Sequence, residues 1–236
     1  MNNIRINNLT HTYYIDNREI NVIKNLNLEL TNGEITVVLG KSGCGKTTLL
    51  RLIQGIEEPT SGTIIKENLK LSIIFQEPRL MPWLNVFENV TFHKLKKSEI
   101  DRDEVYSLLK LVNLDNFINA YPLQLSGGMQ SRVSLIRSLL YKPDCLLLDE
   151  PFAALDYFTR ERLQDELIKL KNISGVTMLF VTHSIDEAIR IADKIYVMNN
   201  GTFKNTYKLD MSQKDIFSEK YIELKRSILM DLKEEE

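Results

Sequence analysis

The chain has 236 residues, of which 43% are hydrophobic and 26% are charged, and its formal net charge at pH 7 is −2. This composition is ordinary for a globular protein with a sizeable core, and the near-neutral charge disfavours a protein that coats nucleic acid. No apolar run approaches the roughly 18 residues that a membrane-spanning helix needs, so a membrane role would have to come through a partner.

The first ten residues are too polar to form the apolar core of a secretory signal, which makes the cytoplasm the default location. Cys44 and Cys145 do not have the spacing of metal ligands or of a disulfide pair, and we expect both to be reduced and structural. The lysines Lys94, Lys96 and Lys97 predict a solvated helix face.

Alternating apolar and polar residues predict strands at residues 4–9 and 22–30, with a turn at 16–18 between them. Tyr13 and Tyr14 fall at the end of the first strand. An exposed aromatic side chain there could stack on a nucleobase, because every base has a flat face. The alternative is an ordinary strand-end aromatic residue.

Residues 40–47 read Gly-Lys-Ser-Gly-Cys-Gly-Lys-Thr and match the phosphate-binding pattern G-x-x-x-x-G-K-[ST]. They follow an apolar run at 35–39, which is typical of a buried parallel strand, and precede a predicted helix at 47–54 that Gly55 ends. The alternative is a glycine-rich turn before a helix.

Glycines in such a loop let successive backbone N–H groups converge on a phosphate, and the helix that follows presents its positive end there. Lys46 would reach the outer phosphates, and Thr47 would offer its hydroxyl to a magnesium ion. The candidate nucleotide-binding residues of this stretch are Gly40, Ser42, Gly43, Cys44, Gly45, Lys46, Thr47 and Thr48.

Short strands are predicted at 63–65 and 71–75, and two prolines make residues 76–83 a loop. This loop contains Leu80 and Trp83, apolar groups that an exposed loop has no reason to hold. Either they fold back on the core or they form a surface for a partner.

Apolar residues at three- and four-residue steps predict a helical lobe from Asn85 to Tyr141, inserted between strands. Within it, residues 125–130 place Ser126 and two glycines at the head of a helix. This is an anion-binding arrangement, and the alternative is a plain helix cap with a flexible lead-in.

Residues 145–148 predict a buried strand that ends in Asp149 and Glu150, at the edge where open parallel sheets bind ligands. Asp149 would point at the magnesium shell, and Glu150 would orient a water molecule. The alternative is that the two acids cap the next helix. His183 follows another predicted strand, at 177–181, on the same ligand side, although most lone histidines are structural.

The remaining predicted elements continue the alternation of strands and helices. They are helices at 159–171 and 185–191, a strand at 194–198, a turn at 199–201, and a final helix from about residue 212 that ends in the acidic residues 234–236.

Six motifs in this order resemble the ATP-binding subunit of ABC transporters over nearly the full chain. They are Walker A at residues 40–47, the Q-loop glutamine Gln76, the signature sequence at 125–129, Walker B at 145–150, the D-loop at 154–156 and the switch histidine His183. Tyr13 fits the family's adenine-stacking aromatic by its position.

The resemblance implies an α/β fold, a P-loop NTPase of ABC type with a mostly parallel core sheet, an antiparallel β lobe and an inserted helical lobe. Residues 1–236 would form one ATPase domain. Its expected parts are a RecA-like core with the β lobe at 1–84 and 142–211, a helical lobe at about 85–141 and a C-terminal helix at about 212–232.

The resemblance also implies ATP and Mg²⁺ as ligands, and two copies that pack head to tail. Ser126 and Gly128 of one copy would cover the ATP bound to the other. The implied catalytic residues are Glu150, His183, Lys46 and Gln76, the implied metal ligands are Thr47, Gln76 and Asp149, and the implied further nucleotide contacts are Tyr13, Ser126, Gly127, Gly128 and Asp156.

The sequence of residues 76–86 is similar to the corresponding segment in importers of the nitrate, sulfonate and taurine type. Uptake of a thiamine precursor is a related possibility. That implies a peripheral location on the cytoplasmic face of the membrane, a permease docked near residues 76–83 and an extracytoplasmic solute-binding protein. Other hypotheses are a non-transport relative acting on DNA or the ribosome, and a regulator without turnover.

Two features depart from the family pattern. Gln130-Ser131-Arg132 stands where a basic residue followed by Gln-Arg is usual, and residues 63–72 are shorter than usual, which predicts a trimmed antiparallel lobe.

Overall fold

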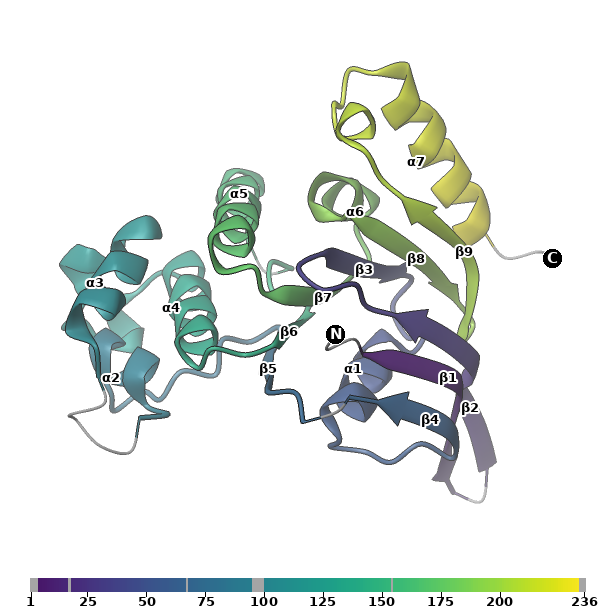
Figure 1. Cartoon of the computed structure of the whole chain (residues 1–236), viewed down its shortest axis with the longest axis horizontal. Helices are drawn as coiled ribbons and strands as arrows, with labels where there is room; N and C mark the ends of the chain where they lie inside the picture. Colours follow the sequence, from purple (N-terminus) through teal and green to yellow (C-terminus); the bar gives the residue numbers. More distant parts are fainter. Residues whose placement is uncertain (1–3, 17, 67, 95–99, 154, 234–236) are drawn as a thin grey trace. The chain divides into compact units, whose positions relative to one another are not determined.

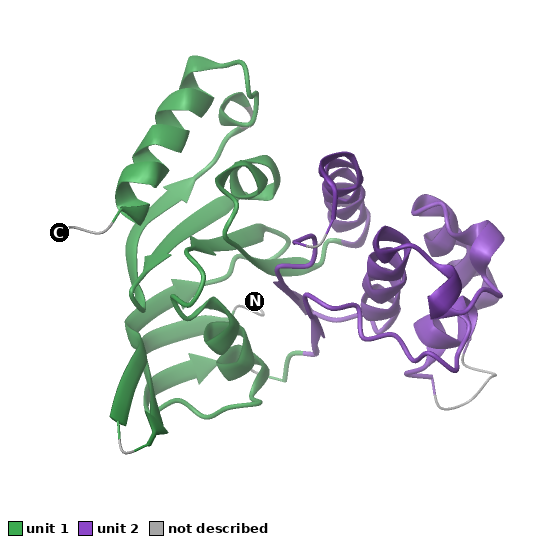
Figure 2. Cartoon of the chain, turned by 180° about the vertical axis from the view of Figure 1, so that it is seen from behind, with its two compact units in different colours: residues 1–69, 175–236 green, residues 70–174 purple. Residues whose placement is uncertain are grey.

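The computed structural model describes residues 4–16, 18–66, 68–94, 100–153 and 155–233. The predictions that concern residue 17, Lys96, Lys97, Ala154 and residues 234–236 lie outside these ranges. The chain divides into two compact units, one of residues 1–69 and 175–236 and the other of residues 70–174 (Figure 2).

The first unit contains an antiparallel sheet in the order β2-β1-β4 (Figure 1). Its strands are β1 (Arg5–Ile15), β2 (Arg18–Glu29) and β4 (Ser61–Ile65). β1 runs well beyond the predicted end at residue 9, and Tyr13 and Tyr14 lie near its C-terminal end at Ile15, as the sequence predicted. Tyr13 pairs with Ile20 inside the hairpin.

The same unit holds a parallel set of strands around β3 (Ile35–Gly40). β3 pairs in parallel with β7 (Thr177–Thr182) on one side and with β8 (Lys194–Asn199) on the other. Every residue of β3 and β7 is buried, as expected for parallel strands whose two faces are covered. Helices α1 (Lys46–Gln54) and α6 (Ile185–Ile191) pack on these strands.

The C-terminal part of this unit differs from the prediction in two ways. β9 (Thr202–Lys208) pairs antiparallel with β8 and was missed, because its residues are mostly polar and exposed, as in an edge strand. The last helix, α7 (Glu219–Leu232), begins after residue 212, because Met211–Gln213 form only a 3₁₀ turn, η4, and Ser218 caps α7.

The second unit pairs β5 (Leu71–Ile74) in parallel with β6 (Cys145–Asp149). Its helices are α2 (Val86–Thr91), α3 (Arg102–Leu111), α4 (Gly127–Leu140) and α5 (Tyr157–Ser174), with short 3₁₀ turns η2 (Asp115–Phe117) and η3 (Pro122–Gln124). Lys94 follows the end of α2, so its assignment to a helix face was wrong. Within the described ranges, every helix is too short or too polar to span a bilayer.

A buried ion pair joins α4 to α5 in the second unit. The Nε atom of Arg132 lies 3.1 Å from an oxygen of Glu166, and both side chains are at least nine-tenths buried. The other oxygen of Glu166 lies 3.4 Å from Nε of the more exposed Arg162. Removing one partner of a buried pair leaves a buried charge without compensation.

We therefore expect Glu166→Ala to lower the free energy of unfolding by about 3–5 kcal/mol, because Arg132 stays buried and charged. The double variant Arg132→Met, Glu166→Leu should recover most of that loss, since it removes both charges and keeps the volume. Urea unfolding followed by circular dichroism measures both effects. An equal loss of unfolding free energy in the single and the double variant would contradict this account.

Helix α7 is fastened to α6 through Asp186. The hydroxyl of Tyr221 and the ammonium of Lys225 both donate to this carboxylate, the latter at 2.5 Å. Burial alone would raise the pKa of Asp186, but the hydrogen bonds from Lys225 and Tyr221 bring it below its ordinary value. A carboxylate with a depressed pKa stabilises the folded state at neutral pH, and that contribution is lost as the pH falls.

Asp186→Asn should therefore reduce stability at pH 7 by a modest amount, about 1 kcal/mol or less, because the pair is solvent-exposed. The difference in the free energy of unfolding between the variant and the wild type should shrink as the pH falls through about 4. Urea unfolding at a series of pH values tests this, with Glu223→Gln, which changes an exposed acid of α7, as the control. A difference that grows toward acid pH would show that the sign is wrong.

Candidate functional site

The predicted phosphate loop connects β3 to α1, and two of its glycines, Gly40 and Gly45, are required by the chain's own packing. A Cβ atom on Gly40 would lie 2.5 Å from Sγ of Cys44 and 2.5 Å from the carbonyl oxygen of Met198. Gly45 has φ = 108° and leaves only 2.8 Å between such an atom and the carbonyl oxygen of Val22. No side chain fits at either position.

Lys46 is the first residue of α1, and only 5% of it is exposed. Its ammonium donates to the carbonyl oxygens of Gly40 at 2.8 Å and Lys41 at 3.0 Å, so the charge is held inside the curl of the loop. Ser42, Gly43 and Thr47 are exposed, whereas Cys44, Gly45 and Thr48 are buried. The loop thus offers a hydroxyl, a cation and the positive end of α1 on one side.

His183 leaves its strand beside the phosphate loop. In the parallel register, Leu39 of β3 pairs with Thr182 of β7, so Gly40 and His183 follow at the same sheet edge. The buried hydroxyl of Thr182 donates to Glu187 and accepts from the backbone N–H of Ser184 at 3.0 Å. These bonds fix the backbone on both sides of His183, whose side chain is exposed.

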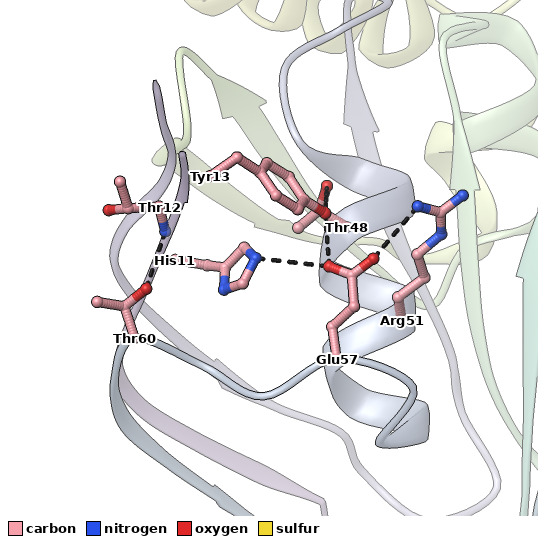
Figure 3. Close-up of polar contacts among 7 residues, drawn as sticks. All are labelled: His11, Thr12, Tyr13, Thr48, Arg51, Glu57 and Thr60. Carbon is pink, nitrogen blue, oxygen red and sulfur yellow. Dashed lines mark hydrogen bonds and ion pairs between the residues drawn. The ribbon is translucent and has the colours of Figure 1, made fainter. Parts of the chain in front are cut away.

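Tyr13 lies against the first turn of α1 (Figure 3). Its hydroxyl donates to Glu57 at 2.5 Å and lies 3.4 Å from the hydroxyl of Thr48. Burial and the hydrogen bond to Glu57 raise the pKa of Tyr13 above its ordinary value. Tyr14, the next residue of β1, is 69% exposed.

In the second unit, Gln76 and the two acids also lie at paired strand ends, with Asp149 as the last residue of β6. Ile74 of β5 pairs with Leu148 of β6, which places Gln76 and Asp149 beyond the same edge. Gln76 is exposed, whereas Asp149 is 9% exposed. Glu150 has φ = 44°, an uncommon conformation for a residue other than glycine, and its carbonyl accepts from Ala153 at 3.1 Å. Such strain is often found at functional positions.

The signature residues form the N-terminus of the fourteen-residue helix α4. Ser126 caps the helix by accepting from the N–H of Met129 at 3.3 Å, as the plain-cap alternative also requires. A Cβ on Gly128 would lie 2.7 Å from Thr159, whereas Gly127 has open space around it.

The two residues that depart from the family pattern have structural partners here. The amide of Gln130 donates to the carbonyls of Pro122 at 2.9 Å and Leu125 at 3.3 Å, which fastens the segment leading into α4. The hydroxyl of Ser131 donates to the carbonyl of Gly127 at 3.1 Å. The substitutions therefore leave the cap at Ser126 in place.

Asp156 caps α5, because its carboxylate accepts from the N–H of Thr159 at 3.1 Å. The hydrogen bonds from Thr159 lower the pKa of Asp156, so this exposed group stays ionised.

Side-chain hydrogen bonds from Asn89 and Arg137 fix the loop of residues 76–83. The side chain of Asn89 donates to the carbonyls of Met81 and Leu84 at 3.1 and 2.8 Å, and it accepts from the N–H of Met81 at 2.9 Å. Arg137 donates to the carbonyls of Pro78 and Arg79 at 2.9 and 3.0 Å. Burial lowers the pKa of Arg137.

The apolar groups of this loop differ in their exposure. Leu80 and Met81 are half-buried, whereas Trp83 is 72% exposed. Sequence reasoning missed Asn89, Arg137 and Glu57. Arg137 and Glu57 act on segments distant in sequence, whereas Asn89 acts on residues five and eight positions before it, and no recognised local spacing marks any of the three.

The oxygen donors suit a hard cation. Mg²⁺ keeps several waters and is usually held by one or two carboxylates together with substrate phosphates. Thr47 of the first unit supplies an exposed hydroxyl, and Asp149 of the second unit supplies a carboxylate; each is by itself a donor of the type that this cation accepts. Among the described residues, no group of three or more His, Cys, Asp or Glu side chains could hold a metal without the substrate. Cys44 and Cys145 are buried and are not joined in a disulfide, as predicted.

Comparison with known proteins places these motifs in a family. A family profile described as ABC transporter matches residues 23–153. An uncharacterized ABC transporter ATP-binding protein of Methanocaldococcus jannaschii is 39% identical, over 98% of this chain and 92% of that protein.

Two relatives are named as aliphatic sulfonates import ATP-binding proteins. The one from Bacillus anthracis is 41% identical and covers 83% of this chain and 81% of its own length. The one from Pseudomonas syringae pv. tomato is 45% identical and covers 80% of each chain.

Solved structures agree with the fold. A dimeric ATP-binding cassette in a post-hydrolysis state, bound to ADP and Pi, has a TM-score of 0.77 and 32% identity, covering 88% of this chain and 99% of that one. A part of an ABC transporter complex from Clostridium perfringens has a TM-score of 0.80 and 28% identity, covering 95% and 94%. The chain therefore belongs to the ABC transporter family and is one of its ATP-binding, ATP-hydrolysing cassettes.

Proposed function

We propose that the chain powers an importer of a small sulfonate or a similar solute, with nitrate, taurine and a thiamine precursor as neighbouring possibilities. The observation that carries this proposal is the 41–45% identity, over at least 80% of the chain, to two proteins named for aliphatic sulfonate import. The alternative, a cassette acting on DNA or the ribosome, is disfavoured because the relatives described above are named for transport.

ATP would bind with its phosphates in the loop of residues 40–47 and its base against Tyr13. The curl of the loop, the buried ammonium of Lys46 and the N-terminus of α1 support this orientation, since all three favour a polyanion. Thr48 supports the packing of the site, because it is buried and its hydroxyl lies beside the hydroxyl of Tyr13.

Hydrolysis would depend on positioning and on stabilisation of developing charge. Glu150 would orient the attacking water and accept its proton, and His183 would donate to the γ-phosphate. A bound Mg²⁺ would neutralise phosphate charge. Thr47, Gln76 and Asp149 are the proposed residues that hold it, directly or through water.

We propose that two copies, each working as one ATPase domain, pack head to tail. Ser126, Gly127 and Gly128 of one copy would then cover the nucleotide on the other, with Asp156 nearby. The capped N-terminus of α4 supports this role, because its backbone presents positive charge to an anion. The related cassette bound to ADP and Pi is described as dimeric.

The membrane partner would be a permease that docks on the loop of residues 76–83, at the cytoplasmic face of the membrane. An extracytoplasmic solute-binding protein would complete the system. The exposed Trp83, on a loop that Asn89 and Arg137 hold rigid, supports a docking role, because a rigid apolar group loses little entropy on binding.

Glu150→Gln should lower the ATPase rate by about 10²–10⁴-fold, because the amide cannot accept the proton of the attacking water. ATP affinity should stay close to wild type, and the variant should form an ATP-dependent dimer in size-exclusion chromatography. Phosphate release measures turnover. Glu77→Gln, an exposed acid in the same unit, is the control. Wild-type turnover in Glu150→Gln would refute the assignment.

Trp83→Asp should abolish assembly with the permease and leave nucleotide binding intact, because it replaces the exposed apolar group at the end of the docking loop with a charge. The measurement is recovery of membrane protein with the affinity-tagged chain from detergent-solubilised membranes of its own organism. Phe217→Asp is the matched control, since Phe217 is 88% exposed in the other unit. Unchanged recovery with Trp83→Asp would sink the docking assignment.

A further inference from the structure

Glu57 lies in the turn after α1 and contacts side chains from two other segments (Figure 3). One carboxylate oxygen, Oε2, accepts from the hydroxyl of Tyr13 at 2.5 Å and lies 3.5 Å from Nε2 of His11. The other oxygen, Oε1, accepts from the guanidinium of Arg51 at 3.3 Å. The carboxylate is thus held at both oxygens, and its side chain is only 22% exposed.

These contacts fix the ring of Tyr13 at both of its ends. β1 holds the backbone, and Glu57 holds the hydroxyl through a hydrogen bond to an ionised group, which is stronger than a neutral one. The imidazole of His11, which is 8% exposed, packs edge-on against the ring at 4.7 Å with an interplanar angle of 90°. The ring therefore has one defined orientation.

That orientation is tied to the phosphate loop. The Tyr13 hydroxyl lies 3.4 Å from the hydroxyl of Thr48, which is the third residue of α1 and comes directly after Thr47. The raised pKa of Tyr13 keeps this hydroxyl protonated, so it remains a donor to Glu57. Tyr13 itself is half-buried, which leaves part of the ring accessible.

We propose that Glu57 is a positioning residue of the nucleotide site, which holds the Tyr13 ring where the nucleobase stacks. The inference rests on the proposed function, since it takes Tyr13 as the base contact. Glu57 would affect only the binding of the nucleobase and not the binding of the phosphates. If the Tyr13 ring were mobile and had to become ordered during binding, the affinity for ATP would be lower, because the binding free energy would include the loss of side-chain rotamer entropy.

The test compares two probes, ATP and inorganic tripolyphosphate, each with Mg²⁺, by isothermal titration calorimetry. Glu57→Ala should weaken ATP binding by about 3- to 10-fold, the range expected for one mobile side chain. Tripolyphosphate binding should not change, because it has no base. Glu57→Gln should restore part of the ATP affinity, since its amide oxygen accepts from the Tyr13 hydroxyl.

A double-mutant cycle identifies the partner. In a Tyr13→Phe background, Glu57→Ala should have no further effect on ATP affinity, because the hydroxyl that it holds is already absent. Glu58→Gln, an exposed acid one residue along, is the control for the change in charge. Unchanged tripolyphosphate affinity also shows that the phosphate loop is still folded in each variant.

Three results would overturn the inference. One is an equal fall in ATP and tripolyphosphate affinity, which would assign Glu57 to general stability. The second is an undiminished effect of Glu57→Ala in the Tyr13→Phe background. The third is a wild-type chain that binds tripolyphosphate but not ATP, which would overturn the proposed nucleotide site together with this inference. The first two leave the proposed function intact.

Discussion

Where β3 ends, the chain has no room for a side chain, since a Cβ at Gly40 would approach both Cys44 and the backbone of Met198 to 2.5 Å. This close packing curls the loop so tightly that Lys46 reaches back to the carbonyls of Gly40 and Lys41. The packing of the chain itself therefore requires glycine at positions 40 and 45, whether or not a ligand is bound. A loop fixed in this way presents its charge without paying an ordering cost when a phosphate binds.

The other candidate residues are also held by rigid structure, because each lies next to the end of a strand or helix. His183 stands between two backbone segments that Thr182 and Glu187 hold, and Ser126 and Asp156 each cap a long helix. Parallel strands bring chain ends to one edge, and rigid elements there give side chains a defined direction.

Much of this could be predicted from the sequence, because the motifs sit where strand and helix signals change. The run before Gly40 and the end of the helix at Gly55 are local features, and both were located correctly. β9 was missed because an exposed edge strand has no buried face to create a pattern. The length of β1 was missed because its register shifts between Ile6 and Thr12 interrupt the alternation.

The contacts that could not be predicted join segments distant in sequence, and they are the ones that hold the functional loops. Arg137 reaches back 59 residues to the carbonyl of Pro78, and Tyr13 reaches forward 44 residues to Glu57. No short-range spacing encodes such pairs, since an arginine or glutamate on a half-buried surface has many possible partners. Motifs thus identify the residues that meet the ligand, whereas the residues that orient them become visible only in the folded chain. In this cassette the second group consists of charged and amide side chains that bind backbone carbonyls or a tyrosine hydroxyl, which fixes direction as well as distance.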